Sequence, residues 1–378
     1  MKLKSFFEID INPDRVYGLD IIRAFAILFV VAGHGGNLME SETYKYIDLF
    51  LFDGVSIFFV LSGFLIGRIL IEIIKEKSIS FKVILNFWIR RWFRTLPNYY
   101  LILTLVVFLN VIFNKIFNPF DYYKYFLFSQ NLFHIHPNFF PEAWSLSIEE
   151  WFYIITPLII FILIRVFILS VDKSILITVA AIILFTTLFR YYRFSSLFID
   201  NIETWNSMLR TQILTRLDSL MYGLIGAYIY INYFNFWSKY KVQLFVIGLF
   251  LFTLTKFNFL NFSQFGLYDC VFSFSVVSIA TLFLLPYLSL LKNGRGFIYK
   301  YTTIISLISY SMYLVNYTIV LEWIIIKIDW RILANFNSHI ALISKNVLFW
   351  FLTIFISIIT YKYFEIPLMK LRDKLEIK

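Results

Sequence analysis

Apolar runs long enough to cross a lipid bilayer recur along almost the whole chain. A spanning helix needs roughly 20 apolar residues, and it pairs its own backbone groups where no water can do so. Only 15% of the residues are charged, well below the roughly 25% of soluble domains. We therefore expect an all-α polytopic membrane protein with about ten spans: Gly18–Met39, Ile47–Ile74, Pro97–Phe117, Ala143–Phe167, Ser174–Phe189, Thr215–Phe234, Val242–Leu260, Tyr268–Leu291, Ile304–Ile326 and Ile340–Pro367.

Lys and Arg collect on one side of these spans. The segments on the same side of the membrane as the N-terminus carry about three times as many Lys and Arg residues as the segments on the opposite side. Enrichment in Lys and Arg is typical of cytoplasmic loops. We therefore expect both termini in the cytoplasm and the protein in the plasma membrane. The net charge of +10 then reflects topology and contact with anionic lipid headgroups, and not nucleic-acid binding.

The spans are not interrupted by a linker or a low-complexity tract. Residues 1–378 are therefore expected to form a single membrane domain, with a cytoplasmic N-terminal segment at 1–17 and a cytoplasmic tail at 368–378. We expect no cleavable signal peptide, because the first apolar run contains Arg23 and lacks a small-residue cleavage site.

The first span carries ionisable residues, which are costly at bilayer depth and therefore indicate a functional site. Asp20, Arg23 and His34 stand among Ile, Leu, Phe, Val and Ala. At about 100° per residue, the spacing from Arg23 to His34 returns the side chain to within roughly 20° of the same helix face. The glycines that flank His34 would let a substrate or another backbone approach it. This pattern favours a catalytic or transport site.

The fourth span brings two carboxylates in from the outer face. Glu149 and Glu150 lie near its start, and a span that begins near Ala143 places Glu149 at about the depth of His34. A carboxylate next to an imidazole fixes its tautomer and raises its basicity, which makes a general base. The alternative is that the glutamates only hold helices together.

A basic and aromatic stretch, Phe81–Pro97, precedes the third span. It could be an interfacial helix that places its arginines among lipid headgroups. The sharper hypothesis is a phosphate site, because Arg91 and Arg94 lie on one helical face and guanidinium groups bind phosphate bidentately. A cytosolic cofactor with a diphosphate would bind there.

The outer loop 118–141 contains two histidines, His134 and His136. Neither has a carboxylate or cysteine at metal-ligand spacing, so we expect no metal.

Further motifs follow one another along nearly the whole chain. They are VLSGFLIG at Val60–Gly67, the basic segment Asn86–Pro97, AWSLSIEEWFY at Ala143–Tyr153, RLDSLMYGLIGA at Arg216–Ala227, SYSMYL at Ser309–Leu314 and FEIPLMKLR at Phe364–Arg372. Together with the arginine and histidine of the first span, and in this order, they resemble the acyltransferase 3 family of integral-membrane acyltransferases.

The resemblance implies a cytoplasmic acyl-CoA donor, usually acetyl-CoA, and a glycan or other acceptor at the outer face. By the matching motifs, His34 would be the essential catalytic residue, Arg23 a functional intramembrane residue and Glu149 the acidic residue of the fourth span. Arg91 and Arg94, with Arg90 beside them, would contact the phosphates of CoA.

The sequence departs from the family pattern in three places. Ser56 stands where relatives often have an acidic residue, Trp151 where glutamine is common, and Asn316 where a histidine commonly follows the SYSMYL segment. These departures concern the acceptor pocket more than the donor site. We expect Asp20, Glu150 and Asn316 to bind the acceptor.

We therefore expect a membrane-bound, acetyl-CoA-dependent O-acyltransferase that modifies a hydroxyl of a cell-surface or lipid-linked glycan. The donor would reach His34 past Arg23, and His34, oriented by Glu149, would remove the proton of the hydroxyl. The alternative is a proton-coupled secondary transporter of a small or sugar-like solute, since intramembrane Arg, His and Glu also suit a proton path. The lack of an internal repeat argues against transport. Oligomeric state stays open.

Overall fold

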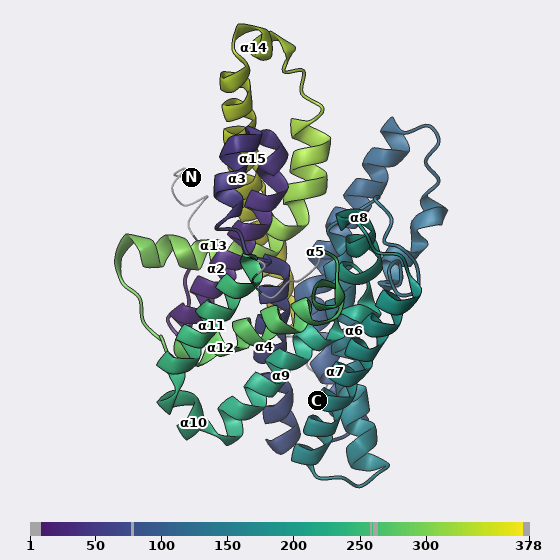
Figure 1. Cartoon of the computed structure of the whole chain (residues 1–378), viewed down its shortest axis with the longest axis vertical. Helices are drawn as coiled ribbons and strands as arrows, with labels where there is room; N and C mark the ends of the chain where they lie inside the picture. Colours follow the sequence, from purple (N-terminus) through teal and green to yellow (C-terminus); the bar gives the residue numbers. More distant parts are fainter. Residues whose placement is uncertain (1–8, 77–78, 258, 260–263, 373–378) are drawn as a thin grey trace.

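Helices make up the fold, as the sequence predicts (Figure 1). The computed structural model describes residues 9–76, 79–257, 259 and 264–372, and over these residues it contains no β-strand. Within this part of the chain, eight helices are long and apolar enough to cross a membrane. They are built on α2 (Tyr17–His34), α4 (Gly54–Glu76), α5 (Phe81–Phe113), α6 (Ala143–Arg165), α7 (Val171–Ser196), α12 (Ser273–Leu288), α13 (Gly296–Val315) and α15 (Ser338–Thr360). The all-α polytopic class is confirmed.

Two shorter helices overlap the other two predicted spans. α9 (Leu217–Asn232) and α11 (Lys241–Lys256) have 16 residues each. That length is about 24 Å of helix, less than a hydrocarbon core of about 30 Å. The count of ten spans therefore stays a prediction.

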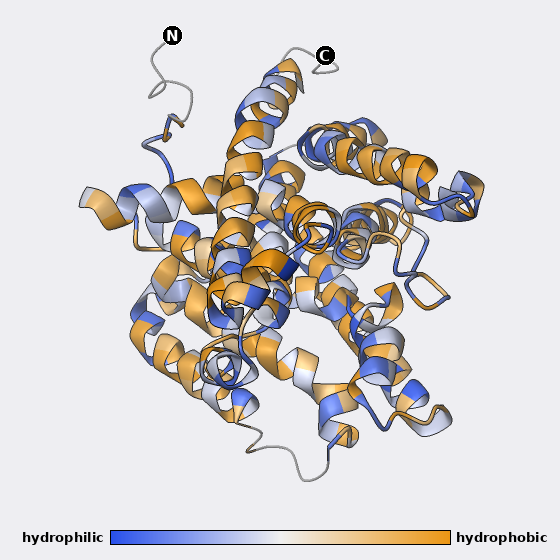
Figure 2. Cartoon of the chain, turned by 90° about the horizontal axis from the view of Figure 1, so that it is seen from above, coloured by the Kyte–Doolittle hydropathy of each residue, from blue (hydrophilic) through white to orange (hydrophobic). Residues whose placement is uncertain are grey.

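Short helical elements connect the long ones. The remaining α-helices are α3 (Ser41–Asp48), α8 (Ile202–Trp205), α10 (Phe234–Lys239), α14 (Arg331–Phe336) and α16 (Ile366–Arg372), with 3₁₀ turns at Gly35–Leu38, Pro119–Leu127 and Ile213–Thr215 and π-helices at Asn206–Arg210, Tyr268–Phe272, Asn316–Ile325 and Tyr361–Glu365. π-Helical turns are rare and are frequently found at functional sites. Apolar residues cover most of the helical ribbons (Figure 2), and α15 rises from the body to α14 at the top of Figure 1.

The basic stretch before the third span is part of one long helix. α5 begins at Phe81, where the hydroxyl of Ser80 accepts the N–H of Val83, and it continues past Pro97 to Phe113. Proline has no N–H to donate and usually kinks or ends a helix, but here the helix runs through it. The helix that carries the third span therefore begins 16 residues before the predicted start of that span at Pro97, and the arginines belong to the same helix.

Glycines bring α4 and α9 into backbone contact. A Cβ atom on Gly63 would lie 2.0 Å from the carbonyl oxygen of Leu220, and one on Gly223 would lie 2.1 Å from that of Val60. Small residues at such crossings are the usual way for membrane helices to gain packing energy, because lipid offers no hydrophobic drive for association. This close crossing fixes the face of α4 that borders the candidate site.

Candidate active site

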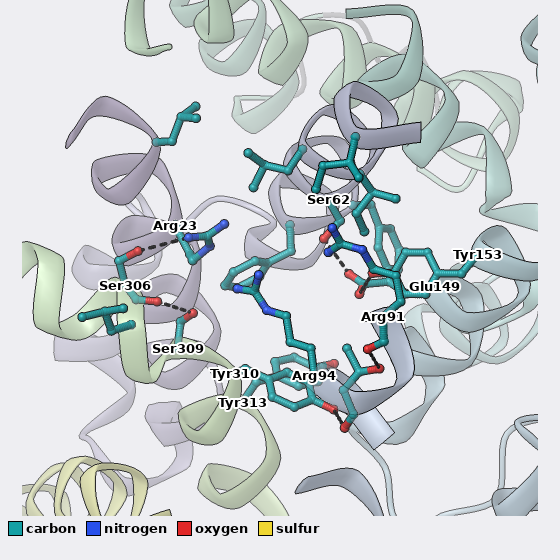
Figure 3. A pocket seen from close by; sticks show the side chains of 18 of the residues that line it. Arg23, Ser62, Arg91, Arg94, Glu149, Tyr153, Ser306, Ser309, Tyr310 and Tyr313 are labelled. Atoms are coloured by element: carbon teal, nitrogen blue, oxygen red, sulfur yellow. Dashed lines mark hydrogen bonds between the residues drawn. The ribbon is translucent and has the colours of Figure 1, made fainter. Parts of the chain in front are cut away.

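A polar cavity of about 450 Å³ lies among five long helices. Side chains from α2, α4, α5, α6 and α13 line it, together with Glu365 from the π-helix that follows α15. Its charged lining residues are Arg15, Asp20, Arg23, Arg68, Glu72, Arg91, Arg94, Glu149 and Glu365. Figure 3 shows Arg23, Arg94 and Glu149 around a common space. Five arginines against four carboxylates give the lining an excess of positive charge, which suits an anionic ligand.

Asp20 and Arg23 form one end of the polar lining. Asp20 accepts hydrogen bonds from Arg15, with Nε 2.9 Å away, and from the hydroxyl of Ser306 over 2.7 Å. Nη1 of Arg23 lies 3.4 Å from the same hydroxyl and 3.8 Å from Asp20. Asp20 therefore joins α2 to α13, and it leaves much of the Arg23 guanidinium facing the cavity.

Glu149 also faces this cavity, on the wall opposite Arg23 (Figure 3). Its carboxylate accepts from the hydroxyl of Ser62 over 3.1 Å and from that of Tyr153 over 2.9 Å. Both oxygens are thereby engaged by hydroxyl groups of the cavity wall.

The imidazole of His34 pairs with Asn316 instead. Nδ1 of His34 lies 2.6 Å from Oδ1 of Asn316. The amide nitrogen of Asn316 donates to the carbonyls of Met312 and Tyr313 over 2.8 and 2.9 Å, so its oxygen must be the atom that faces the imidazole. An amide oxygen only accepts, so Nδ1 carries the proton and Nε2 keeps its lone pair. That tautomer is the one a general base needs.

The orienting partner expected for His34 therefore differs from the one found. Glu149 was expected at about the depth of His34, but its carboxylate lies on the cavity wall opposite Arg23, and Nδ1 of His34 is taken by Asn316, which was expected to bind the acceptor. His34 itself is absent from the cavity lining. It is connected to the lining through Asn316, whose amide nitrogen donates to the carbonyl of the lining residue Tyr313.

Glu142, a residue that the sequence analysis did not select, supports this arrangement. It is buried directly before α6. Its carboxylate accepts from the hydroxyl of Thr318 over 2.6 Å and from the backbone N–H of Thr318 over 3.2 Å, and its own carbonyl accepts from the Tyr313 hydroxyl over 3.0 Å. It thus holds residues on both sides of Asn316. An acidic residue immediately before the AWSLSIEEWFY segment was the available signal.

The basic residues of α5 border the same cavity, and the Tyr310 hydroxyl of α13 donates to the carbonyl of Thr95, the residue after Arg94, over 2.7 Å. Arg91 and Arg94 line the cavity, and both also line a smaller adjoining space of about 130 Å³ with Arg90. Glu150, expected to bind the acceptor, does not line the cavity. It is buried and accepts from the hydroxyl of Thr95 over 2.9 Å, which links α6 to α5.

In the part of the chain that the structure describes, no group of three or more His, Cys, Asp and Glu side chains could hold a metal ion. His136 is buried with Nε2 3.1 Å from the carbonyl of Phe140, whereas His134 is exposed.

Comparisons with known proteins agree with the motifs. Residues 16–362 match the family model described as an acyltransferase domain. The O-acetyltransferase OatA of Staphylococcus aureus is 27% identical over 385 residues, covering 95% of this chain and 58% of that protein. The peptidoglycan O-acetyltransferase OatA of Listeria monocytogenes is 32% identical over 165 residues, covering 40% of this chain and 25% of that protein.

The putative peptidoglycan O-acetyltransferase YrhL of Bacillus subtilis is 32% identical over 164 residues, covering 37% of this chain and 23% of that protein. The chain thus spans little more than half the length of the most extensively matched relatives. No solved structure matches. Because the family model extends over nearly all of the membrane-spanning region described above, the chain belongs to the acyltransferase 3 family.

Proposed function

We propose that this protein transfers an acyl group, in the first place acetyl, from acyl-CoA to a hydroxyl of a cell-envelope glycan. The observation that carries the proposal is the His34–Asn316 pair, which contacts the lining residue Tyr313 of an arginine-lined cavity. It combines a base in the correct tautomer with a buried route that suits an anionic donor.

The donor would enter at the end that holds Arg91 and Arg94. Guanidinium groups bind phosphate bidentately, and two of them one helical turn apart match a diphosphate. The rule that cytoplasmic loops carry Lys and Arg supports placing this end in the cytosol and the protein in the plasma membrane. The pantetheine arm of CoA would then extend past Arg23 toward Tyr313, and its thioester would reach His34.

The chemistry requires one base and no covalent enzyme intermediate. Nε2 of His34 takes the proton of the acceptor hydroxyl while that oxygen attacks the thioester carbonyl. The carbon–sulfur bond breaks, and the CoA thiolate recovers the proton from the imidazolium. A placed general base contributes about 10²–10⁴-fold, and positioning of the two substrates supplies much of the rest.

The relatives support a glycan acceptor of the cell wall, since two of them are named for peptidoglycan O-acetylation. A test uses protein reconstituted in vesicles, with labelled acetyl-CoA on one side and peptidoglycan fragments on the other. We expect label in the glycan, and its loss in His34→Gln with CoA binding unchanged.

Two results would contradict this function. Undiminished transfer by His34→Gln would remove the base assigned here. Passage of the acceptor across the vesicle while the thioester stays intact would instead support the alternative, a proton-coupled secondary transporter of a small or sugar-like solute.

A further inference from the structure

A network of arginine and aspartate side chains lies beside the candidate site, and the reaction proposed above does not use it. Its inner part is fully buried: Nη2 of Arg190 donates to Oδ2 of Asp218 over 2.8 Å, and the hydroxyl of Ser275 donates to the same oxygen over 3.0 Å. Arg216, also fully buried, lies against the ring of Phe274 at 4.2 Å.

The outer part of this network lies toward the side on which the acceptor would bind. Arg216 donates to the hydroxyl of Ser56 over 2.6 Å, and that hydroxyl donates to Asp53 over 2.6 Å. Nη2 of Arg210 lies 3.3 Å from the other oxygen of Asp53. Ser56, which stands where relatives often have an acidic residue, thus bridges Arg216 and the carboxylate of Asp53, about one helical turn earlier.

Arg210 is the exposed end of this network. Its side chain is 31% exposed, whereas Arg190 and Arg216 are fully buried. Among the described residues, Asp53 is its one hydrogen-bond partner, although a guanidinium carries five donors. The Cζ atom of Arg210 lies 5.4 Å from the centroid of the Trp144 ring, and this contact helps to orient the guanidinium plane. The remaining donors are therefore oriented and open to a ligand.

The charge balance leaves Arg210 incompletely neutralised. Three arginines share two aspartates, and the negative charge of Asp53 acts on both Arg210 and Arg216. Contacts connect Arg210 to the His34 pair: its guanidinium lies over Trp144, and the hydroxyl of the next residue, Ser145, lies 2.6 Å from that of Tyr313, whose carbonyl holds Asn316. This network therefore has one positive charge more than it has negative charges, and Arg210 is its exposed arginine.

We propose that Arg210 binds an anionic group of the acceptor, a carboxylate or a phosphate, and so selects a negatively charged glycan whose hydroxyl then lies against His34. The inference rests on the proposed function and names its substrate class. Arg210 is thereby a specificity residue, and Asp53 is a positioning residue that acts through it.

The test compares two forms of one sugar. A disaccharide that contains N-acetylmuramic acid is used with its lactyl carboxylate free or converted to the methyl amide, and binding to the protein in nanodiscs is titrated without any acyl donor. We expect the free carboxylate to bind at least roughly tenfold more tightly, since charge-assisted bidentate bonds are the strong ones. A second pair, a glycosyl 1-phosphate and its free sugar, distinguishes phosphate from carboxylate.

Arg210→Gln should remove the preference for the charged form, and Arg210→Lys should keep only part of it, because lysine has the charge without the planar fork. Arg331→Gln is the matched control: Arg331 also pairs with a single aspartate, Asp329, over 2.7 Å, but it is 86% exposed and lies on α14, away from His34. This variant should keep the full preference. The thermal midpoint of each variant shows whether it is folded.

Two outcomes overturn the proposal: neither anionic form binds more tightly than its neutral counterpart, or the preference survives in folded Arg210→Gln. Because binding is measured without a donor, these outcomes are separate from a failure of acyl transfer. Charge-dependent binding without transfer would contradict the proposed function and leave the anion site standing. In the transfer assay, Arg210→Gln should raise KM for the charged acceptor at least about tenfold while kcat changes less than about twofold.

Discussion

Nδ1 of His34 and Oδ1 of Asn316 lie 2.6 Å apart, although 281 positions of other sequence, from α2 to the π-helix after α13, come between them. The bond orients the imidazole, and the two carbonyls that hold the Asn316 amide nitrogen decide which of its atoms faces the ring. A neutral side chain thus does what a carboxylate does in many hydrolases: it fixes the tautomer without adding a charge at bilayer depth.

Removal of this bond should slow the chemical step. In Asn316→Ala the proton of His34 is free to occupy either ring nitrogen, so we expect kcat to fall about tenfold or more, within the roughly 10²–10⁴ that a base supplies. Asn316→His retains a nitrogen acceptor and should keep more activity. The measurement is the initial rate of acetyl transfer at saturating donor and acceptor.

Asn110→Ala provides the control for that series. Asn110 also lies on a long helix and donates its amide to the carbonyl one turn earlier, that of Val106, but it lies outside the cavity lining. The rate of acetyl transfer by Asn110→Ala should match that of the unmodified protein. An Asn316→Ala enzyme with full kcat would show that the hydrogen bond to His34 has no role in catalysis.

Glu142 should act on the rate only through Asn316. Its carboxylate holds Thr318, so the loss of this side chain loosens the turn that carries Asn316, whereas the backbone carbonyl that accepts from the Tyr313 hydroxyl remains. We expect Glu142→Ala to lower kcat in the unmodified protein and to cause little further loss in Asn316→Ala. Residues in one hydrogen-bonded unit are non-additive in this way.

The double variant is assayed beside Thr318→Val, which removes the hydroxyl partner and leaves the backbone N–H. Fully additive losses for Glu142→Ala and Asn316→Ala would mean that the carboxylate works by another route. The thermal midpoint shows whether a variant is merely destabilised. The rate of each variant at saturating substrates is divided by its concentration of folded protein.

Much of the fold follows from local sequence, whereas the pairing of the catalytic group does not. Apolar runs give the spans because each helix must satisfy its own backbone in lipid. Position along a helix follows from the helical rise, and Glu149, predicted to belong to the site, does line the cavity. Which neighbour His34 meets depends on how helices rotate and cross, and the backbone contacts at Gly63 and Gly223 that set one such crossing cannot be read from one sequence.

The register of the helix after α13 is the second feature that sequence reasoning could not supply. Up to Val315 the chain is α-helical, and from Asn316 it is π-helical, which changes the azimuth of every residue beyond the transition. The letters SYSMYLVNY carry no mark of that change. The continuation of α5 through Pro97 was hidden for the opposite reason, since proline normally indicates a boundary.

Stability should depend on pH through His136, in the loop before α6. Burial lowers the pKa of His136 to about 4, although its hydrogen bonds to Phe140 and Pro141 oppose the shift. The unfolded chain, with an ordinary histidine pKa near 6.5, then binds the proton more readily. The stabilising contribution is therefore complete above about pH 6.5 and is lost as the pH falls toward about 4, by on the order of 3 kcal/mol.

Thermal midpoints in detergent between pH 8 and pH 4 check this. Other groups titrate in the same range, so the useful quantity is the difference between variants: His136→Phe should show a shallower decline than the unmodified protein. His134→Asn, which changes an exposed histidine two positions earlier, should keep the original decline. Equal declines for all three proteins would mean that His136 does not set the acid limit.

Donor binding should depend on the two arginines of α5 that line the cavity. Arg91→Gln and Arg94→Gln each remove a group that can bind phosphate, and we expect each to weaken CoA binding about tenfold, with the loss growing less at high salt because exposed charges are screened. Arg165→Gln is the control: it changes another arginine near the same end of the bundle, one that donates to the carbonyl of Ile79 and does not line the cavity. Titration of CoA into protein in nanodiscs measures the three affinities. If Arg165→Gln weakens binding as much as the others, general charge and not the cavity attracts the donor. If none of the three changes the affinity, the phosphates of CoA bind elsewhere, and the route from α5 to His34 loses its entrance.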